Sequence, residues 1–338
     1  MNHEPLLRVR ELTKTFQVQG AGKKRGLRAL NGVSFDLKRG ETLGLVGESG
    51  CGKSTLARTL LMLERPDSGE VRFDGVDPFA LKGAELLAWR RRVQMVFQDP
   101  FASLNARMTA GEIIGEPWRT HRSLHPTAVE RAARVRELLD LVGLRKGDEQ
   151  RYPQEFSGGQ RQRIGIARAL ALSPDVIICD EPVSALDLSV QAQVLNLLND
   201  LQRQLGVSYL FISHDLSVVR HVADRVMVMY LGGVVEQGDT ESVFERALHP
   251  YSSALMSAAP SLDADARREH IVLQGELPSP LAPPSGCRFR TRCWKATDAC
   301  ASAAPDTAVD PQDPGHTAAC FHPLEDTSGL VAAGGGGL

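Results

Sequence analysis

Short apolar runs recur along the chain, and each has the length of a β-strand and is followed by a polar or glycine-containing turn. They cover residues 43–46, 93–97, 176–179, 209–212 and 226–229. Segments with helical spacing separate these runs. Such alternation is typical of an α/β domain with a largely parallel sheet. We therefore expect an α/β core as the main part of the chain.

The middle of the chain has a different pattern. Strand-like runs are absent from about residue 99 to 171, whereas residues 127–141 and 159–172 carry apolar side chains at spacings of three and four. This spacing indicates amphipathic helices. The pattern predicts a helical subdomain at about 99–171, inserted within an α/β domain that covers residues 1–250.

The composition changes after residue 250. A proline-rich stretch introduces a segment that holds four of the six cysteines of the chain. We expect a second, small and irregular domain at 251–325. Residues 326–338 end in a glycine run that cannot bury enough apolar surface to offset the entropy of ordering, so they are predicted to be disordered.

Charge and hydropathy narrow the classes of function. The chain has 338 residues, with 39 Lys and Arg against 41 Asp and Glu. Without a basic excess, nucleic acid is a poor candidate partner. No run of about 18 apolar residues would span a bilayer, and residues 1–17 do not resemble a secretory signal. We expect a cytosolic protein, in which clustered cysteines are more often metal ligands or redox-active groups than disulfides.

A phosphate-binding motif follows the run at 43–46 and precedes a helical pattern at 56–63. It consists of Gly47, Glu48, Ser49, Gly50, Cys51, Gly52, Lys53, Ser54 and Thr55. Its glycines let backbone N–H groups converge on phosphate oxygens, Lys53 reaches the β- and γ-phosphates, and Ser54 can bind Mg²⁺. The alternative, a glycine-rich turn without a ligand, is disfavoured by this strand-turn-helix context.

Further candidate residues follow two other apolar runs. Asp180 and Glu181 end the run at 176–179, where Asp180 would lie near Mg²⁺ and Glu181 could polarise an attacking water. A solvated acidic strand end is the alternative. His214 follows the run at 209–212. It could contact the γ-phosphate, and the alternative is a purely structural role. Ser157, Gly158, Gly159 and Gln160 open a helix and offer a second anion site, for another nucleotide or another chain.

With these motifs in this order, the sequence resembles the ATP-binding subunits of ABC transporters over about residues 5–325. The resemblance implies a P-loop NTPase fold, ATP and Mg²⁺ as cofactors, and a competent ATPase. It also implies individual roles: Phe16 stacks on adenine, Gln98 touches Mg²⁺ and the attacking water, Asp180 belongs to the Walker B motif, Glu181 is the catalytic base, Asp187 belongs to the D-loop, and His214 is the switch histidine.

The resemblance also implies partners. Two ATPase subunits close head-to-tail, and residues 157–160 of each complete the ATP site of the other. A sibling subunit is expected rather than a second copy, together with two transmembrane permease subunits that dock on the helical subdomain. An extracytoplasmic peptide-binding protein completes the complex, which places the chain peripherally on the cytoplasmic face of the inner membrane.

A finer resemblance is to the subunits of oligopeptide and dipeptide importers. It rests on residues 98–105 (Q-D-P-F-A-S-L-N), on 249–251 (H-P-Y), on 258–260 (A-A-P) and on the cysteine-containing extension. Nickel and glutathione importers share this layout and remain alternatives. A soluble ABC ATPase acting on ribosomes or nucleic acid is disfavoured by the single signature helix. A metal-binding regulator with a vestigial ATPase conflicts with the intact Glu181 and His214.

The remaining candidate site is formed by Cys287, Cys293, Cys300 and Cys320. Four thiols suffice for a tetrahedral metal shell or an iron–sulfur cluster, but their spacing does not identify the metal. The family resemblance implies a [4Fe–4S] cluster. Zn²⁺, with His316 or His322 as substitute ligands, and free reduced cysteines are the alternatives.

Overall fold

A central eight-stranded sheet organises the molecule. The computed structural model describes residues 4–20, 23–258 and 270–324, so the predicted disordered tail at 326–338 lies outside the described residues. The strand order is β10-β11-β9-β8-β3-β7-β6-β5, and its five-stranded part from β8 to β5 is parallel. These five strands are β3 (Thr42–Val46), β5 (Val93–Val96), β6 (Val176–Asp180), β7 (Ser208–Ile212) and β8 (Arg225–Tyr230).

The parallel strands coincide with the apolar runs, which confirms the predicted α/β fold class. All five residues of both β3 and β7 are buried. Strands in this position are covered on both faces, so both sets of alternating side chains must be apolar and the sequence reads as a continuous run.

A second sheet, with the order β2-β1-β4, is antiparallel and was not indicated by apolar runs. Its strands are β1 (Leu7–Gly20), β2 (Lys23–Leu37) and β4 (Ser68–Phe73). One set of its side chains joins the apolar core, including Leu7, Val9 and Val71. Charged residues such as Arg8 and Arg10 lie between them. Because the apolar positions only alternate, no continuous run marks these strands.

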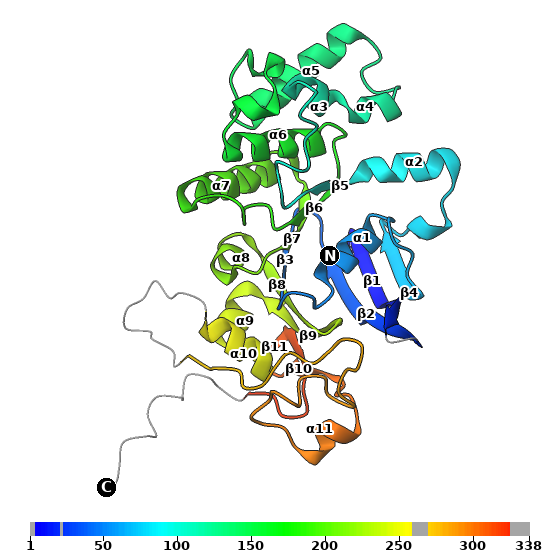
Figure 1. Ribbon diagram of the computed structural model, residues 1–338, viewed down its shortest axis with the longest axis vertical. Coiled ribbons are helices and arrows are strands. Elements are labelled where there is room, and N and C mark those ends of the chain that lie inside the picture. Colours follow the sequence, from blue (N-terminus) through cyan, green and yellow to red (C-terminus); the bar gives the residue numbers. More distant parts are fainter. Residues whose placement is uncertain (1–3, 21–22, 259–269, 325–338) are drawn as a thin grey trace.

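Helices surround the sheets, and the segment between β5 and β6 forms helices and turns without a strand. That segment contains α3 (Ala110–Gly115), α4 (Pro117–Thr120), α5 (Ala128–Leu141) and α6 (Gly158–Leu170), with short 3₁₀ turns at Asp148–Gln150 and Pro153–Glu155. It lies at one end of the molecule, and the C-terminal extension lies at the other (Figure 1).

The other helices lie outside this segment. They are α1 (Lys53–Leu60), α2 (Gly83–Arg92), α7 (Leu188–Leu205), α8 (Leu216–Val222), α9 (Thr240–Glu245), α10 (Pro250–Ser257) and α11 (Asp298–Ser302), with a 3₁₀ turn at Pro78–Ala80. Within the described residues, no helix has the length and apolar character needed to cross a membrane.

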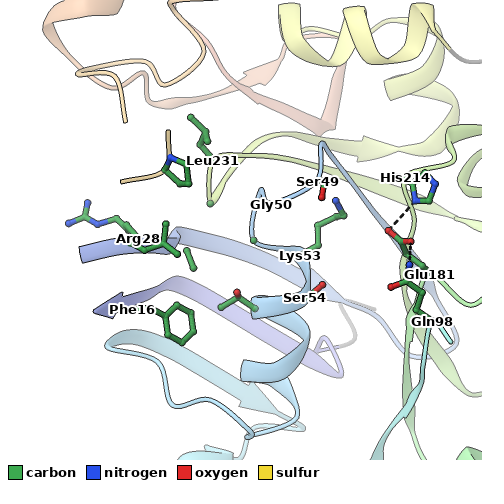
Figure 2. A pocket seen from close by; sticks show the side chains of 16 residues that line it. Phe16, Arg28, Ser49, Gly50, Lys53, Ser54, Gln98, Glu181, His214 and Leu231 are labelled. Carbon is green, nitrogen blue, oxygen red and sulfur yellow. Dashed lines mark hydrogen bonds and ion pairs between the residues drawn. The ribbon is translucent and has the colours of Figure 1, made fainter. Parts of the chain in front are cut away.

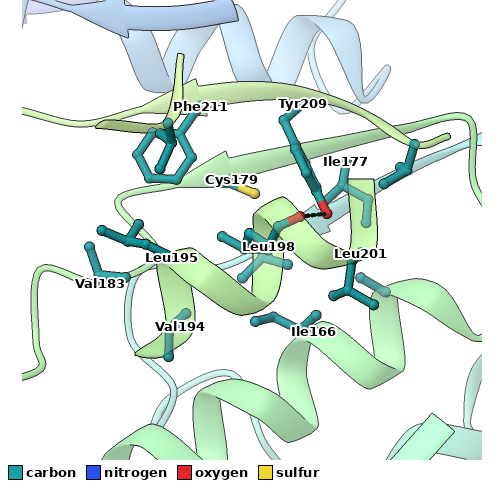
Figure 3. Close-up of a cluster of buried hydrophobic side chains, with 14 of the residues drawn as sticks. Ile166, Ile177, Cys179, Val183, Val194, Leu195, Leu198, Leu201, Tyr209 and Phe211 are labelled. Carbon is teal, nitrogen blue, oxygen red and sulfur yellow. Dashed lines mark hydrogen bonds between the residues drawn. The ribbon is translucent and has the colours of Figure 1, made fainter. Parts of the chain in front are cut away.

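Helix α7 shows how local sequence and packing cooperate. Asp187 caps its N-terminus by accepting a hydrogen bond from the Val190 N–H, and Gly206 ends it in the left-handed conformation. Its buried side chains, at one helical face, are Val194, Leu195, Leu198 and Leu201. They pack against β6, β7 and α6 (Figure 3). The buried Tyr209 hydroxyl donates to the Leu198 carbonyl oxygen at 3.1 Å.

The C-terminal extension continues the main sheet. Strand β11 (Asp313–Ala319) pairs antiparallel with β9 (Gly233–Asp239) and with β10 (Thr307–Asp310). The fully buried His316 Nε2 lies 2.7 Å from the Glu236 carboxylate, which joins the two elements. The extension is therefore irregular around its cysteines but regular where it adds strands to the sheet.

The packing of α7 predicts a large effect of Leu198→Ala. Leu198 is 2% exposed, so the substitution removes buried apolar atoms and leaves a cavity. We expect a loss of about 2–5 kcal/mol in the free energy of unfolding. Leu188→Ala is the matched control on the same helix, because Leu188 is 81% exposed; its effect should stay within about 0.5 kcal/mol. Urea denaturation measures both, and equal losses would contradict the packing described.

Candidate nucleotide site

The turn between β3 and α1 passes very close to neighbouring backbone. Gly47 has a φ of 149°, and a Cβ there would lie 2.2 Å from the Met229 carbonyl oxygen. Gly52 has a φ of 110°, and a Cβ there would lie 2.4 Å from the Ala29 carbonyl oxygen. A larger residue at either position would be strained and would clash. Gly47 and Gly52 are therefore needed for the backbone to follow this turn.

Lys53 begins α1 and directs its ammonium group back into the turn. Its Nζ donates hydrogen bonds to the carbonyl oxygens of Gly47 at 2.7 Å and Glu48 at 3.1 Å. The N-terminus of α1 has no side-chain cap. Its first backbone N–H groups are therefore not used by a capping side chain, and together with Lys53 they favour an anion at this point.

Three predicted catalytic residues meet at the carboxyl edge of the sheet. Gln98 follows β5, Glu181 follows β6, and His214 follows β7. The Gln98 Nε2 donates to Glu181 Oε2 at 2.7 Å, and His214 Nδ1 lies 3.0 Å from Glu181 Oε1 (Figure 2). Both carboxylate oxygens of Glu181 therefore have a partner. Glu181 itself has a φ of 48°, an uncommon backbone conformation for a residue other than glycine.

Asp180 lies just before Glu181 and, like it, is partly buried. Burial, and to a smaller extent the negative charge of Glu181, raise the pKa of Asp180, whereas the charges of Lys53 and Arg58 lower it. Two adjacent carboxylates, one of them largely desolvated, are stabilised by a divalent cation. The oxygens of Asp180, Ser54 and Gln98 are hard donors of the kind that Mg²⁺ prefers, so these residues fit a Mg²⁺ ion.

A cavity of about 760 Å³ adjoins these groups. Its lining residues include Phe16, Lys53, Ser54, Gln98, Glu181 and His214 (Figure 2). Gly47, Glu48, Cys51 and Asp180 are not among the lining residues. The cavity is also lined by residues that were not predicted from the sequence: Leu27, Arg28, Ala29, Leu231, Gly232 and Pro280. No motif marks these positions, because they reach the cavity from β2, from the end of β8 and from the extension.

Two predicted groups lie outside this cavity. Ser157 is exposed and caps α6, since its Oγ accepts from the Gln160 N–H while Gln160 Oε1 accepts from the Ser157 N–H at 3.0 Å. Asp187 caps α7, and its hydrogen bonds with Ser189 and Val190 lower its pKa. The structure therefore does not bring residues 157–160 or Asp187 to the nucleotide cavity of their own chain.

The four cysteines of the extension lie near one another. Burial raises the pKa of Cys320 to about 11; the His322 N–H opposes this rise and the charges of the other three thiols add to it. Burial also raises the pKa of Cys287 and Cys293, while the backbone N–H groups of Phe289 and Lys295 oppose this. Within the described residues, however, no three His, Cys, Asp or Glu side chains form a group that could hold a metal ion. The predicted cluster is thus not supported by the arrangement of these side chains.

Comparisons with known proteins agree with this geometry. The ABC transporter family description matches residues 30–184, and the description "Oligopeptide/dipeptide transporter, C-terminal region" matches residues 235–300. The dipeptide transport ATP-binding protein DppF of Haemophilus influenzae is 53% identical over 94% of this chain and 97% of its own. The putative oligopeptide transport ATP-binding protein YkfD of Bacillus subtilis is 52% identical over 95% of this chain and 96% of its own.

Solved structures show the same fold. The dimeric ATP-binding cassette MJ0796, in a post-hydrolysis state with ADP and phosphate, aligns with a TM-score of 0.61 and 31% identity over 69% of this chain and 98% of its own. The cbiO1 protein of Clostridium perfringens aligns with a TM-score of 0.62 and 28% identity over 72% of this chain and 91% of its own. The chain therefore belongs to the ABC transporter ATPases, in the family of peptide-import ATP-binding proteins.

Proposed function

We propose that this chain energises the import of dipeptides or oligopeptides by binding and hydrolysing ATP in a membrane-bound ABC transporter. The observation that carries the proposal is the cavity beside Lys53, where Glu181 is held by Gln98 and His214. Its similarity to the dipeptide and oligopeptide transport ATP-binding proteins supports a peptide substrate. Nickel or glutathione import would use the same ATPase and differ only in the cargo.

Each group at the cavity has a role in this proposal. Phe16 stacks on adenine, and residues 47–55 hold the phosphates through backbone N–H groups and Lys53. Asp180, Ser54 and Gln98 would hold Mg²⁺, which would neutralise charge on the phosphates. Glu181 accepts a proton from the attacking water, and His214, which lies beside it, contacts the γ-phosphate.

Residues 157–160 serve the nucleotide of a second ATPase subunit. They lie outside the cavity of their own chain, and Ser157, the first of them, is exposed, so a partner's γ-phosphate can reach it. Asp187 would lie at the same interface. ATP then bridges two subunits before hydrolysis and cannot afterwards, which biases the dimer between closed and open states. The dimeric solved cassettes support this arrangement.

The full complex contains a sibling ATPase, two transmembrane permeases and an extracytoplasmic peptide-binding protein. The chain would sit peripherally on the cytoplasmic face of the inner membrane, with its helical subdomain against the permeases. This assembly rests on the family to which the chain belongs.

Glu181→Gln tests the catalytic assignment. The amide keeps the size and the contacts of the side chain but is no longer a base, so the hydrolysis rate should fall at least ~100-fold. Binding of Mg·ATP should persist. Glu137→Gln is the control, because the Glu137 side chain is 64% exposed on α5. Hydrolysis by Glu181→Gln at the wild-type rate would show that Glu181 is not the base.

Purification with native partners tests the role in peptide import. We expect recovery from the membrane fraction with two integral subunits and a related ATPase, and hydrolysis that rises when dipeptides or oligopeptides are supplied with the binding protein. Stimulation by nickel or glutathione instead would identify a different cargo. Recovery with ribosomes or DNA, and without integral membrane subunits, would overturn the transport role.

We further propose that the four cysteines of the extension bind a [4Fe–4S] cluster. The described side chains do not themselves form a metal-binding group; the proposal rests on the family resemblance, on the presence of four thiols in one small segment, and on the His322 N–H, which donates to Cys320 Sγ at 3.4 Å. Backbone N–H groups aimed at sulfur stabilise cluster thiolates. When bound, the cluster would cross-link residues 287–300 to residue 320 and supply the small segment with stability that it cannot obtain from apolar burial.

Metal analysis of anaerobically purified protein tests the cluster. We expect a brown protein with about four iron atoms per chain, and loss of the iron in Cys300→Ser. Cys179→Ala is the control, since Cys179 is buried in β6; it should keep its iron. A colourless wild-type protein with stoichiometric zinc, or with no metal, would overturn the proposal.

A further inference from the structure

The C-terminal extension makes a direct ionic contact with the phosphate-binding loop. Arg292 Nη1 donates to Glu48 Oε2 at 2.8 Å, and Nη2 donates to Oε1 at 3.1 Å. The two side chains are 244 residues apart in sequence and only 9% and 26% exposed. A two-pronged pair of a guanidinium and a carboxylate in so little solvent fixes both partners in one orientation.

The backbone N–H, the carbonyl oxygen and the carboxylate of Glu48 all form hydrogen bonds. Its backbone N–H donates to the Tyr251 hydroxyl at 2.9 Å, and its carbonyl oxygen accepts from Lys53 Nζ at 3.1 Å. Its carboxylate binds Arg292. The carbonyl oxygen also accepts from the Cys51 N–H at 3.3 Å. The contacts from Lys53 and Cys51 come from the nucleotide-binding motif itself, whereas Tyr251 lies on α10 and Arg292 belongs to the extension.

The C-terminal extension also contacts the turn after β8, which lines the cavity. Arg288 donates to the Leu231 carbonyl oxygen. The next residue, Gly232, donates its N–H to the Cys51 carbonyl oxygen of the loop at 2.8 Å. Leu231 and Gly232 both line the cavity. The segment therefore reaches the loop at two points, directly through Glu48 and indirectly through the turn after β8.

An apolar contact sets the position of the segment between these two arginines. The buried Phe289 ring packs against Tyr230, with ring centres 5.3 Å apart, and against Tyr251, with ring centres 5.4 Å apart. Tyr251 is the residue that also binds the Glu48 N–H. Packed aromatic side chains have little freedom, so the backbone at 288–292 is fixed relative to the loop.

We propose that Arg292 is a positioning residue for the phosphate-binding loop. By holding Glu48 it keeps the loop in its phosphate-binding form, so that the cysteine-containing extension becomes part of the nucleotide site. The inference rests on ATP binding in the proposed function. A loop ordered beforehand loses less entropy when the nucleotide binds, and the gain appears as tighter binding.

Kinetics of Arg292→Met test this role. Because the contact orders the loop without touching the reacting atoms, the KM for ATP and the Kd for Mg·ADP should both rise about tenfold, whereas kcat should change by less than about twofold. Arg292→Lys, which keeps the charge but not the fork, should fall between wild type and Arg292→Met. Arg290→Met is the matched control: its guanidinium binds Ser285 of the same segment, so its constants should equal those of wild type.

A double-mutant cycle with Glu48→Ala separates positioning from general destabilisation. In the Glu48→Ala background, Arg292→Met should change the Kd for Mg·ADP by less than about twofold, because its partner is already absent. An equal weakening in both backgrounds, or unchanged KM and Kd in Arg292→Met, would overturn the inference. If Arg292→Met does not fold, the cycle is run with Arg292→Lys. A wild-type protein that binds no ATP would instead refute the proposed function.

Discussion

The nucleotide site depends on how closely the turn after β3 approaches its neighbours. At Gly47 and Gly52 the backbone passes the carbonyl oxygens of Met229 in β8 and Ala29 in β2, with no room for a side chain. The turn is therefore wedged between the two sheets of the molecule. Since β3 lies inside the parallel part of the main sheet, this contact also places the turn at the edge where β5, β6 and β7 deliver their polar residues.

At that edge, two neighbouring carboxylates have different surroundings. Glu181 is oriented through both of its carboxylate oxygens by residues from two other strands. For Asp180, one position earlier, burial raises the pKa, whereas the nearby charges of Lys53 and Arg58 lower it. A single strand end thus presents two carboxylates in unlike environments, which suits one for a cation and the other for a water molecule. Neither arrangement involves residues 157–160, which do not line this cavity.

Sequence patterns predicted the parallel core because its strands are buried on both faces, so that residues such as Leu43 and Ile212 stand in unbroken apolar runs. They did not predict β1, where Arg8 and Arg10 separate the buried positions. The loop, Glu181 and His214 were found because local motifs specify them. Arg292 and Pro280 were missed, since nothing local marks a contact with a loop more than 200 residues earlier in the chain. The sequence shows that four cysteines lie in one short segment, but it does not show how their side chains are arranged in space.

The pairing of β11 with β9 also has a consequence for synthesis on the ribosome. Glu236 of β9 and His316 of β11 are 80 residues apart, so β9 leaves the ribosome well before the strand that covers it. Until then β9 is an open edge, and a glutamate that ends fully buried faces solvent. Open edges invite pairing with other chains. A nascent chain that pauses between these strands therefore exposes the edge of β9 to other chains, and β11, the last strand within the described residues, is the one that covers it.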